Sequence, residues 1–108
     1  MGYNLHIERD KSIDPITLQE WQAYVAGDPE MRLEQELAEW VPAGEKIKDG
    51  LAGWMNHPDL KEKGEPYFFH FWTKSIVVRS ADDHLIKKMK RIAEKLKAVV
   101  RGDEGEEY

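Results

Sequence analysis

The chain has 108 residues and a formal net charge of −5, and 34% of its residues are charged. This length predicts a single domain, residues 1–108, with one two-layer core. The absence of cysteine excludes disulfides, thiolate metal sites and cysteine nucleophiles, and it fits a reducing cytoplasm. The first ten residues lack an apolar signal segment, and no stretch approaches the roughly 18 apolar residues of a membrane span, so we expect a cytoplasmic protein without membrane contact.

The charges are unevenly placed along the chain. Residues 28–65 hold ten acidic and five basic residues, whereas residues 85–101 hold seven basic residues and one acid. Residues 102–108 add four acids. We interpret this last segment as an acidic tail that could be flexible, or could fold back on the basic helix and screen it.

The N-terminal part of the chain predicts a strand followed by a helix. Apolar and polar residues alternate over residues 2–9, which is the pattern of a half-buried strand. Thr17 and Glu20 have the spacing of a capping box at the start of a helix. The apolar stripe of that helix includes Trp21, and Gly27 ends it.

The segment from residue 31 to residue 66 is ambiguous. Residues 31–41, MRLEQELAEWV, fit either a strand that begins at Met31 or a helix through Leu33, Leu37 and Trp40. Residues 46–50 indicate a short edge strand and turn, and residues 51–58 a further strand anchored by Trp54. Residues 61–66 are typical of a polar loop.

Residues 67–80, YFFHFWTKSIVVRS, predict a β-hairpin. A two-residue loop at Lys74-Ser75 places Trp72 opposite Val77 and His70 opposite Arg79, although these residues suit such a turn poorly and a longer loop remains open. One face of the hairpin is ordinary core: Phe69, Phe71, Ile76 and Val78. The other face carries Phe68, His70, Trp72, Val77 and Arg79.

The C-terminal part predicts a second helix and a last strand. Ser80 starts the helix as its N-cap, and an apolar stripe runs from Leu85 to Leu96. Residues 98–101 indicate a short strand. The fold class is therefore α+β, a small antiparallel or mixed sheet of four to five strands with two main helices on one face. The face with Trp72 then lacks an obvious cover.

Three short motifs carry a resemblance to other proteins: Y-x-L-x-I-x-R in the first predicted strand, L-x-E-W in the first helix and K-M-x-x-I-A in the last helix. With them the chain resembles a group of short uncharacterised bacterial proteins. The resemblance covers about half of the chain and its motifs are structural. It implies a single bacterial domain, and no catalytic residue is carried over from it.

The aromatic face has two interpretations. In one, the segment 33–40 or a second copy of the chain packs on it as ordinary core. In the other, it is an exposed patch that binds a protein partner. The candidate binding residues are Phe68, His70, Trp72, Val77 and Arg79.

A metal site is the main alternative. His6, Glu8 and His70 would form a three-ligand zinc set with an open position if their strands were neighbours. The competing expectation is that Glu8 pairs with Arg79 and no cofactor is bound. His57 and His84 show no convergent partner in the sequence.

The charged segments are also candidate binding sites. The basic helix lacks interleaved aromatic residues and base-reading amides, so nucleic acid is disfavoured, and either a solvated face or pairing with the acidic region 28–65 is expected. Glu30, Glu34, Glu36 and Glu39 suggest an acidic surface, as in an inhibitor or immunity-type protein that blocks a basic enzyme. Our leading hypothesis is a non-enzymatic protein-binding module, and the alternative is a small metal-dependent hydrolase or ligand-binding protein.

Overall fold

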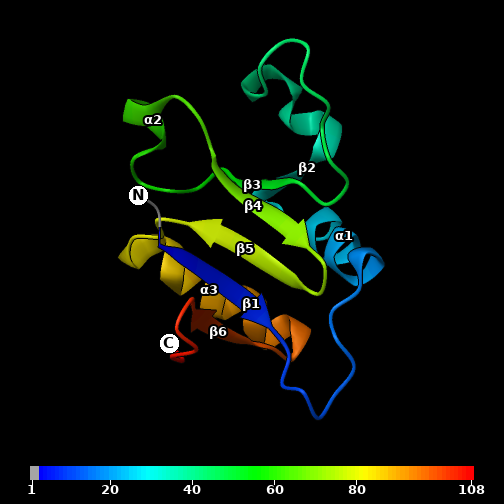
Figure 1. Ribbon diagram of the computed structural model, residues 1–108. Coiled ribbons are helices and arrows are strands. Elements are labelled where there is room, and N and C mark those ends of the chain that lie inside the picture. Colours follow the sequence, from blue (N-terminus) through cyan, green and yellow to red (C-terminus); the bar gives the residue numbers. More distant parts are fainter. Residues whose placement is uncertain (1–2) are drawn as a thin grey trace.

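The computed structural model describes residues 3–108 (Figure 1). The strands are β1 (Asn4–Glu8), β2 (Met31–Leu33), β3 (Ala52–Trp54), β4 (Tyr67–Trp72), β5 (Ser75–Arg79) and β6 (Val99–Gly102). The helices are α1 (Leu18–Ala26), the 3-10 helix η1 (Glu34–Trp40), α2 (Leu60–Lys63) and α3 (Asp83–Leu96). None of the helices within residues 3–108 has the length and apolar character needed to cross a membrane.

The strands form one sheet in the order β2-β3-β4-β5-β1-β6, and every neighbouring pair is antiparallel. The predicted α+β class is confirmed. The sheet has six strands in place of the predicted four to five. The predicted strand at residues 51–58 is present as β3, and the difference arises at β2, which has three residues and is too short to show a period-2 pattern.

Strand β4 joins two halves of this sheet. Its first half, residues 67–69, pairs with β3, and its second half, residues 70–72, pairs with β5. The two strands of the hairpin are therefore paired only from its turn to His70. Nearer the start of β4, residues 67–69 pair with β3, while the end of β5 pairs with β1.

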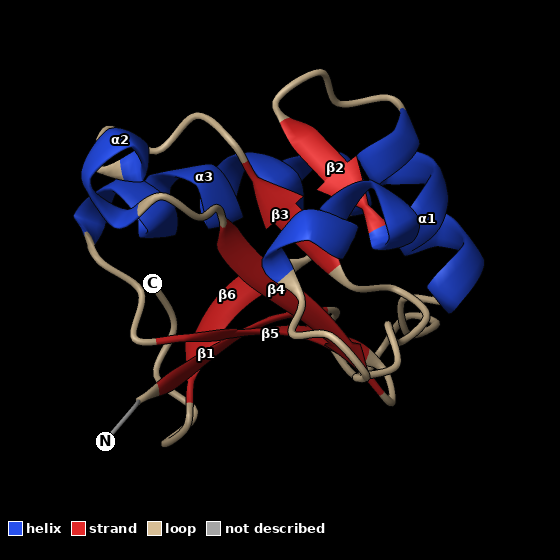
Figure 2. Ribbon diagram, turned by 90° about the horizontal axis from the view of Figure 1, so that it is seen from above, coloured by secondary structure: helices blue, strands red, loops and turns tan. Residues whose placement is uncertain are grey.

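One face of the sheet forms the core, as predicted. Phe69, Ile76 and Val78 are at most 1% exposed and pack with residues of α1 and α3. Trp21 of α1 is fully buried and donates its indole N–H to the carbonyl of Gly50 at 2.7 Å. Figure 2 shows α1 and α3 together on one side of the sheet, while β5 and β1 have no covering element on the other side.

The register of the hairpin differs from the prediction. The loop is Thr73-Lys74, so Trp72 lies opposite Ser75 and His70 opposite Val77. The predicted pairs, Trp72 with Val77 and His70 with Arg79, are wrong by two residues. The two faces are nevertheless as predicted, because an even shift leaves every side chain on its own side.

The first predicted helix cap is confirmed and the second is wrong. The Thr17 hydroxyl accepts from the Glu20 N–H at 3.1 Å, and the Glu20 carboxylate accepts from the Thr17 N–H. In α3 the cap is Asp82, whose carboxylate accepts from the Leu85 N–H at 2.9 Å. Ser80 is still held at the end of the sheet, because its N–H donates to the Tyr3 carbonyl.

The ambiguous segment contains both predicted alternatives in succession. Strand β2 ends at Leu33, and helix η1 follows directly, with Leu37 fully buried. Leu37 packs where Gly53 has no side chain, since a Cβ at Gly53 would lie 2.7 Å from it. The predicted edge strand at 46–50 is absent and these residues form a loop, while the predicted loop 61–66 includes the single turn of α2.

The basic helix pairs with the acidic region, as predicted. Lys88 is only 3% exposed, and its ammonium lies 2.7 Å from Asp28 and 3.0 Å from Glu30. Burial by itself raises the pKa of Asp28, but hydrogen bonds from Lys88 and Tyr24 outweigh it and lower that pKa. Hydrogen bonds from Lys88 and Trp54 likewise lower the pKa of Glu30. These contacts tie α3 to the turn that follows α1.

The acidic tail turns back beside β6 and does not lie on α3. Tyr108 donates its N–H to Val100, and Gly102 donates its N–H to Glu106, each at 2.8 Å. Asp103 accepts from the Asn4 N–H at 3.1 Å. The tail thus occupies the outer edge of the sheet next to β6.

Candidate binding site on the open face of the sheet

The second face of the sheet is covered at one end and open at the other. At the β3 end, Leu37 of η1 packs at Gly53, and Phe68 is half-buried beside Trp40 and Val41. Over β4, β5 and β1 the face is open, and Trp72 is 67% exposed. Segment 33–40, which was predicted to pack on this face, therefore lies near Phe68 but leaves Trp72 uncovered.

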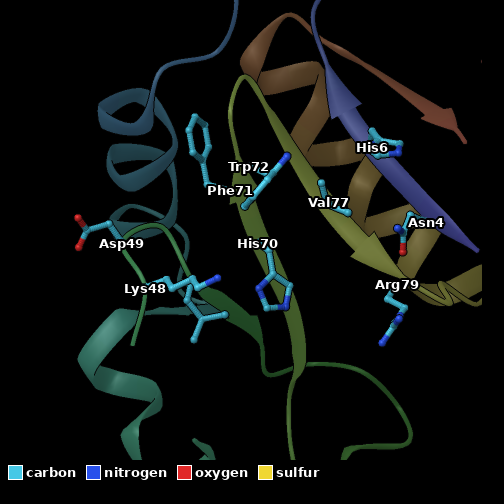
Figure 3. A pocket seen from close by; sticks show the side chains of 10 residues that line it. Asn4, His6, Lys48, Asp49, His70, Phe71, Trp72, Val77 and Arg79 are labelled. Carbon is cyan, nitrogen blue, oxygen red and sulfur yellow. The ribbon is translucent and has the colours of Figure 1, made fainter. Parts of the chain in front are cut away.

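The open part contains a hollow of about 510 Å³. His70, Val77 and His6 lie in one row across β4, β5 and β1, because His70 is opposite Val77 and Val77 is opposite His6. Figure 3 shows this row, with Arg79 at one end of β5 and Lys48 on the loop beside β4. Four of the five predicted binding residues, His70, Trp72, Val77 and Arg79, line this hollow, and Phe68 lines the smaller one next to it.

Trp72 differs from the other tryptophans of the chain. The indole N–H of Trp21 donates to Gly50, that of Trp40 to Gly64 and that of Trp54 to Glu30. Within residues 3–108, the Trp72 indole has no acceptor. Trp72 is thus a large aromatic side chain that is exposed to solvent, whereas buried indoles usually have a hydrogen-bond partner.

Arg79 is the one arginine of the described chain that forms neither an ion pair nor a side-chain hydrogen bond. The predicted pair with Glu8 is wrong, because the antiparallel register places Arg79 opposite Asn4, at the far end of β1. Glu8 instead pairs with Arg101 of β6 at 3.1 Å. The Arg79 guanidinium is left exposed at the rim of the hollow with its five donors free.

Lys48 adds a second cation to the hollow. Partial desolvation of the His70 ring, and then the positive charge of Lys48, lower the pKa of His70. Lys48 lies in the loop for which the sequence predicted a strand. Its approach to His70 depends on how that loop folds, which no local pattern indicates.

The structure does not bring the predicted metal ligands together. The His6 Nε2 is bonded to Asp103 at 2.8 Å, and Glu8 is paired with Arg101. His70 lies two strands from His6 with Val77 between them. These three residues form no metal-ligand group within residues 3–108, where the one such group is His57, Asp59 and Asp82.

That second group is a buried hydrogen-bonded contact which the sequence did not reveal. The His57 Nδ1 accepts from the Asp59 N–H at 3.0 Å, so its Nε2 carries the proton and donates to Asp82 at 2.7 Å. Both ring nitrogens are used, and the imidazole packs against Trp54 and Tyr67. The contact fixes the 55–66 loop to the start of α3, and 25 residues separate its partners, so no local motif marks it.

The open hollow combines aromatic, apolar and charged side chains. It offers an exposed indole, an apolar valine, two cations and the His6 imidazole, which is hydrogen-bonded to Asp103 at 2.8 Å. Comparison with protein-family models, curated proteins and solved structures produced no match. The assignment of function therefore rests on this surface.

Proposed function

We propose that this protein is a small non-enzymatic binding module whose open sheet face contacts a protein partner. The contact surface consists of His70, Trp72, Val77 and Arg79, with Trp72 at its centre. The observation that supports this proposal best is the 67% exposure of Trp72 next to a hollow, since tryptophan and arginine are enriched among the residues that dominate interface energies.

The apolar surface extends past the hairpin tip. Trp72 also lines a second hollow on its other side, together with Ile13, which is 47% exposed. The indole therefore separates two concave regions and presents both of its faces. A partner that packs against it can bury apolar surface on either side of the ring.

The inhibitor version of this function would use the four glutamates of residues 30–39, of which only Glu30 forms an ion pair within residues 3–108. Glu30 binds Lys88, Glu34 accepts from Gln22 and from the Gly50 N–H, and Glu36 accepts from the Leu33 N–H. Among these four glutamates of the described chain, Glu39 alone forms no hydrogen bond or ion pair. None of these four glutamates lines the hollow beside Trp72, so a basic enzyme is not the partner that we favour for this face.

The test is a selection from a random displayed-peptide library on the immobilised protein and on its Trp72→Ala variant. We expect peptides that bind the parent chain and lose at least about tenfold in affinity on the variant, because an interface-centre tryptophan contributes about 2 kcal/mol or more. Tyr108→Ala is the matched control. It removes another exposed aromatic side chain, 42% exposed, which does not line the hollow.

Two results would argue against this function. In the first, the enriched peptides bind Trp72→Ala and Tyr108→Ala with the same affinity as they bind the parent chain. The second is a selection that enriches nothing. Either result would leave Trp72 without a role in recognition.

A further inference from the structure

We infer that the partner segment is acidic and extended, with a carboxylate held by Arg79 and an apolar side chain packed against Trp72. This inference rests on the proposed function and names the chemistry of the partner. Three observations carry it: the free guanidinium, a carboxylate of the chain itself on the same face, and the spacing of Arg79 and Trp72.

The first observation is the state of the cations in the hollow. Arg9 is paired with Glu20 and Arg101 with Glu8, but Arg79 and Lys48 form no ion pair within residues 3–108. Guanidinium forks bind carboxylates through two parallel hydrogen bonds. Among the side chains that line the hollow, these two cations outnumber the one acid, Asp49.

The second observation is a carboxylate that already lies beside the hollow. Asp103 of the tail binds the His6 imidazole at 2.8 Å and the Asn4 N–H at 3.1 Å. Both His6 and Asn4 line the hollow, and Asn4 lies opposite Arg79. The hydrogen bonds from His6 and Asn4 lower the pKa of Asp103. This part of the face thus stabilises a carboxylate in its charged form, one strand away from the free Arg79.

The third observation is the distance between the two anchors. Trp72 is opposite Ser75, and Arg79 lies four residues farther along β5, about 13 Å at the rise of a β-strand. In an extended segment, residues that are four positions apart lie on the same side at this same distance. The partner is therefore expected to place an acidic residue and a large apolar residue four positions apart.

The experiment uses short blocked peptides of glycine and serine as defined probes. The test peptide carries two adjacent glutamates and a leucine four positions after the second. Its control has glutamines in place of the glutamates. Binding is followed by ¹⁵N chemical-shift changes in the full chain. We expect saturable changes at His70, Val77, Arg79 and the Trp72 indole, and an affinity about tenfold higher for the glutamate peptide.

Matched protein variants separate local charge from net charge. Arg79→Gln should reduce the affinity for the glutamate peptide to that for the glutamine peptide. Lys90→Gln removes one positive charge from α3 and should leave the affinity unchanged. Equal binding of the two peptides to the parent chain, or shift changes centred on α3, would overturn the inference.

Two further outcomes distinguish this inference from the proposed function. If the glutamine peptide binds as tightly as the glutamate peptide and both depend on Trp72, the binding function stands and the acidic partner is wrong. If a single-stranded thymidine oligonucleotide binds the same residues more tightly than the glutamate peptide, the partner class is wrong. If no peptide changes any of these resonances, neither proposal survives.

Discussion

Thr73 occupies an unfavourable conformation directly beside the exposed Trp72. Its φ is 60°, in the left-handed region that a β-branched residue rarely adopts. The hairpin nevertheless turns there, and in this register Ile76 lies opposite Phe71 and Val78 opposite Leu5. The burial of the core residues outweighs the unfavourable backbone of one exposed residue.

Replacing Thr73 with glycine should stabilise the protein. The Thr73→Gly variant is expected to raise the free energy of unfolding by about 1 kcal/mol, because glycine adopts positive φ without the Cβ penalty. Urea denaturation measures the change. Lys74→Gly is the control, and it should lower stability by about 0.5 kcal/mol, since Lys74 has no positive φ among the described residues. A loss of stability in Thr73→Gly would mean that the turn has a different conformation.

At the scale of single residues, the sequence indicated which side chains share a face, but not their partners. Alternation places Trp72 and Phe69 on opposite sides of β4 whatever the register. The partner of Arg79 depends on strand order, which alternation does not contain. For the same reason, the contact between His57 and Asp82 could not be predicted, because these residues meet only after two separate loops have folded.

Among the elements, helix α3 is attached to the rest of the molecule partly through a buried charge. Lys88 lies on its core side with Asp28 and Glu30, and both carboxylates have pKa values below their ordinary ones. A carboxyl group whose pKa is lowered by folding stabilises the fold above its unfolded pKa of about 4. That stability is lost as the pH falls through the folded-state pKa.

The Lys88→Met variant tests this attachment. Removal of one partner from a buried ion pair should lower the free energy of unfolding by about 3 kcal/mol at pH 7. The parent chain should lose stability between about pH 5 and pH 2, where Asp28 and Glu30 become protonated. In the variant this loss should be smaller. Denaturant titrations across this pH range measure both effects.

Lys90→Met is the control for that experiment. Lys90 lies on the same helix and is exposed, so this variant should stay within about 0.5 kcal/mol of the parent chain. An equal loss in both variants would show that helix propensity or net charge is responsible, and not the contact of Lys88 with Asp28 and Glu30.

The elements were predicted unevenly, for reasons that differ between segments. Helix α3 and strand β1 carry long regular patterns and were placed within one or two residues. Segment 31–41 holds a strand of three residues followed by a 3-10 helix, and neither is long enough to establish its own period. The 41–51 loop, which supplies Lys48 to the hollow, has no period at all.

In the whole molecule, the two edges of the sheet are protected differently. The edge at β2 is only three residues long, and the edge at β6 is occupied by the tail, with Glu107 bridged to Arg101. Short or covered edges prevent unwanted pairing with other chains. Pairing of another chain with either strand edge is thereby disfavoured.

Removal of residues 103–108 tests the role of the tail. The truncated chain should lose about 2 kcal/mol in the free energy of unfolding, since several hydrogen bonds of about 0.5–1.5 kcal/mol each are lost. Its exposed β6 edge should also produce self-association that rises with protein concentration. Glu104→Ala should have neither effect, because the Glu104 side chain forms no hydrogen bond or ion pair within residues 3–108. An unchanged stability of the truncated chain would show that the tail contacts are energetically unimportant.

The openness of the sheet face can be measured on the four indole N–H resonances. A soluble paramagnetic agent broadens these signals according to their exposure, and the measurement is repeated over a protein concentration series. We predict that the Trp72 signal is broadened most, to the same extent at every concentration, while Trp21 and Trp54 are protected. A Trp72 signal as protected as that of Trp21, or one that becomes protected as the concentration rises, would mean that the face is already covered, and it would contradict the binding-module proposal.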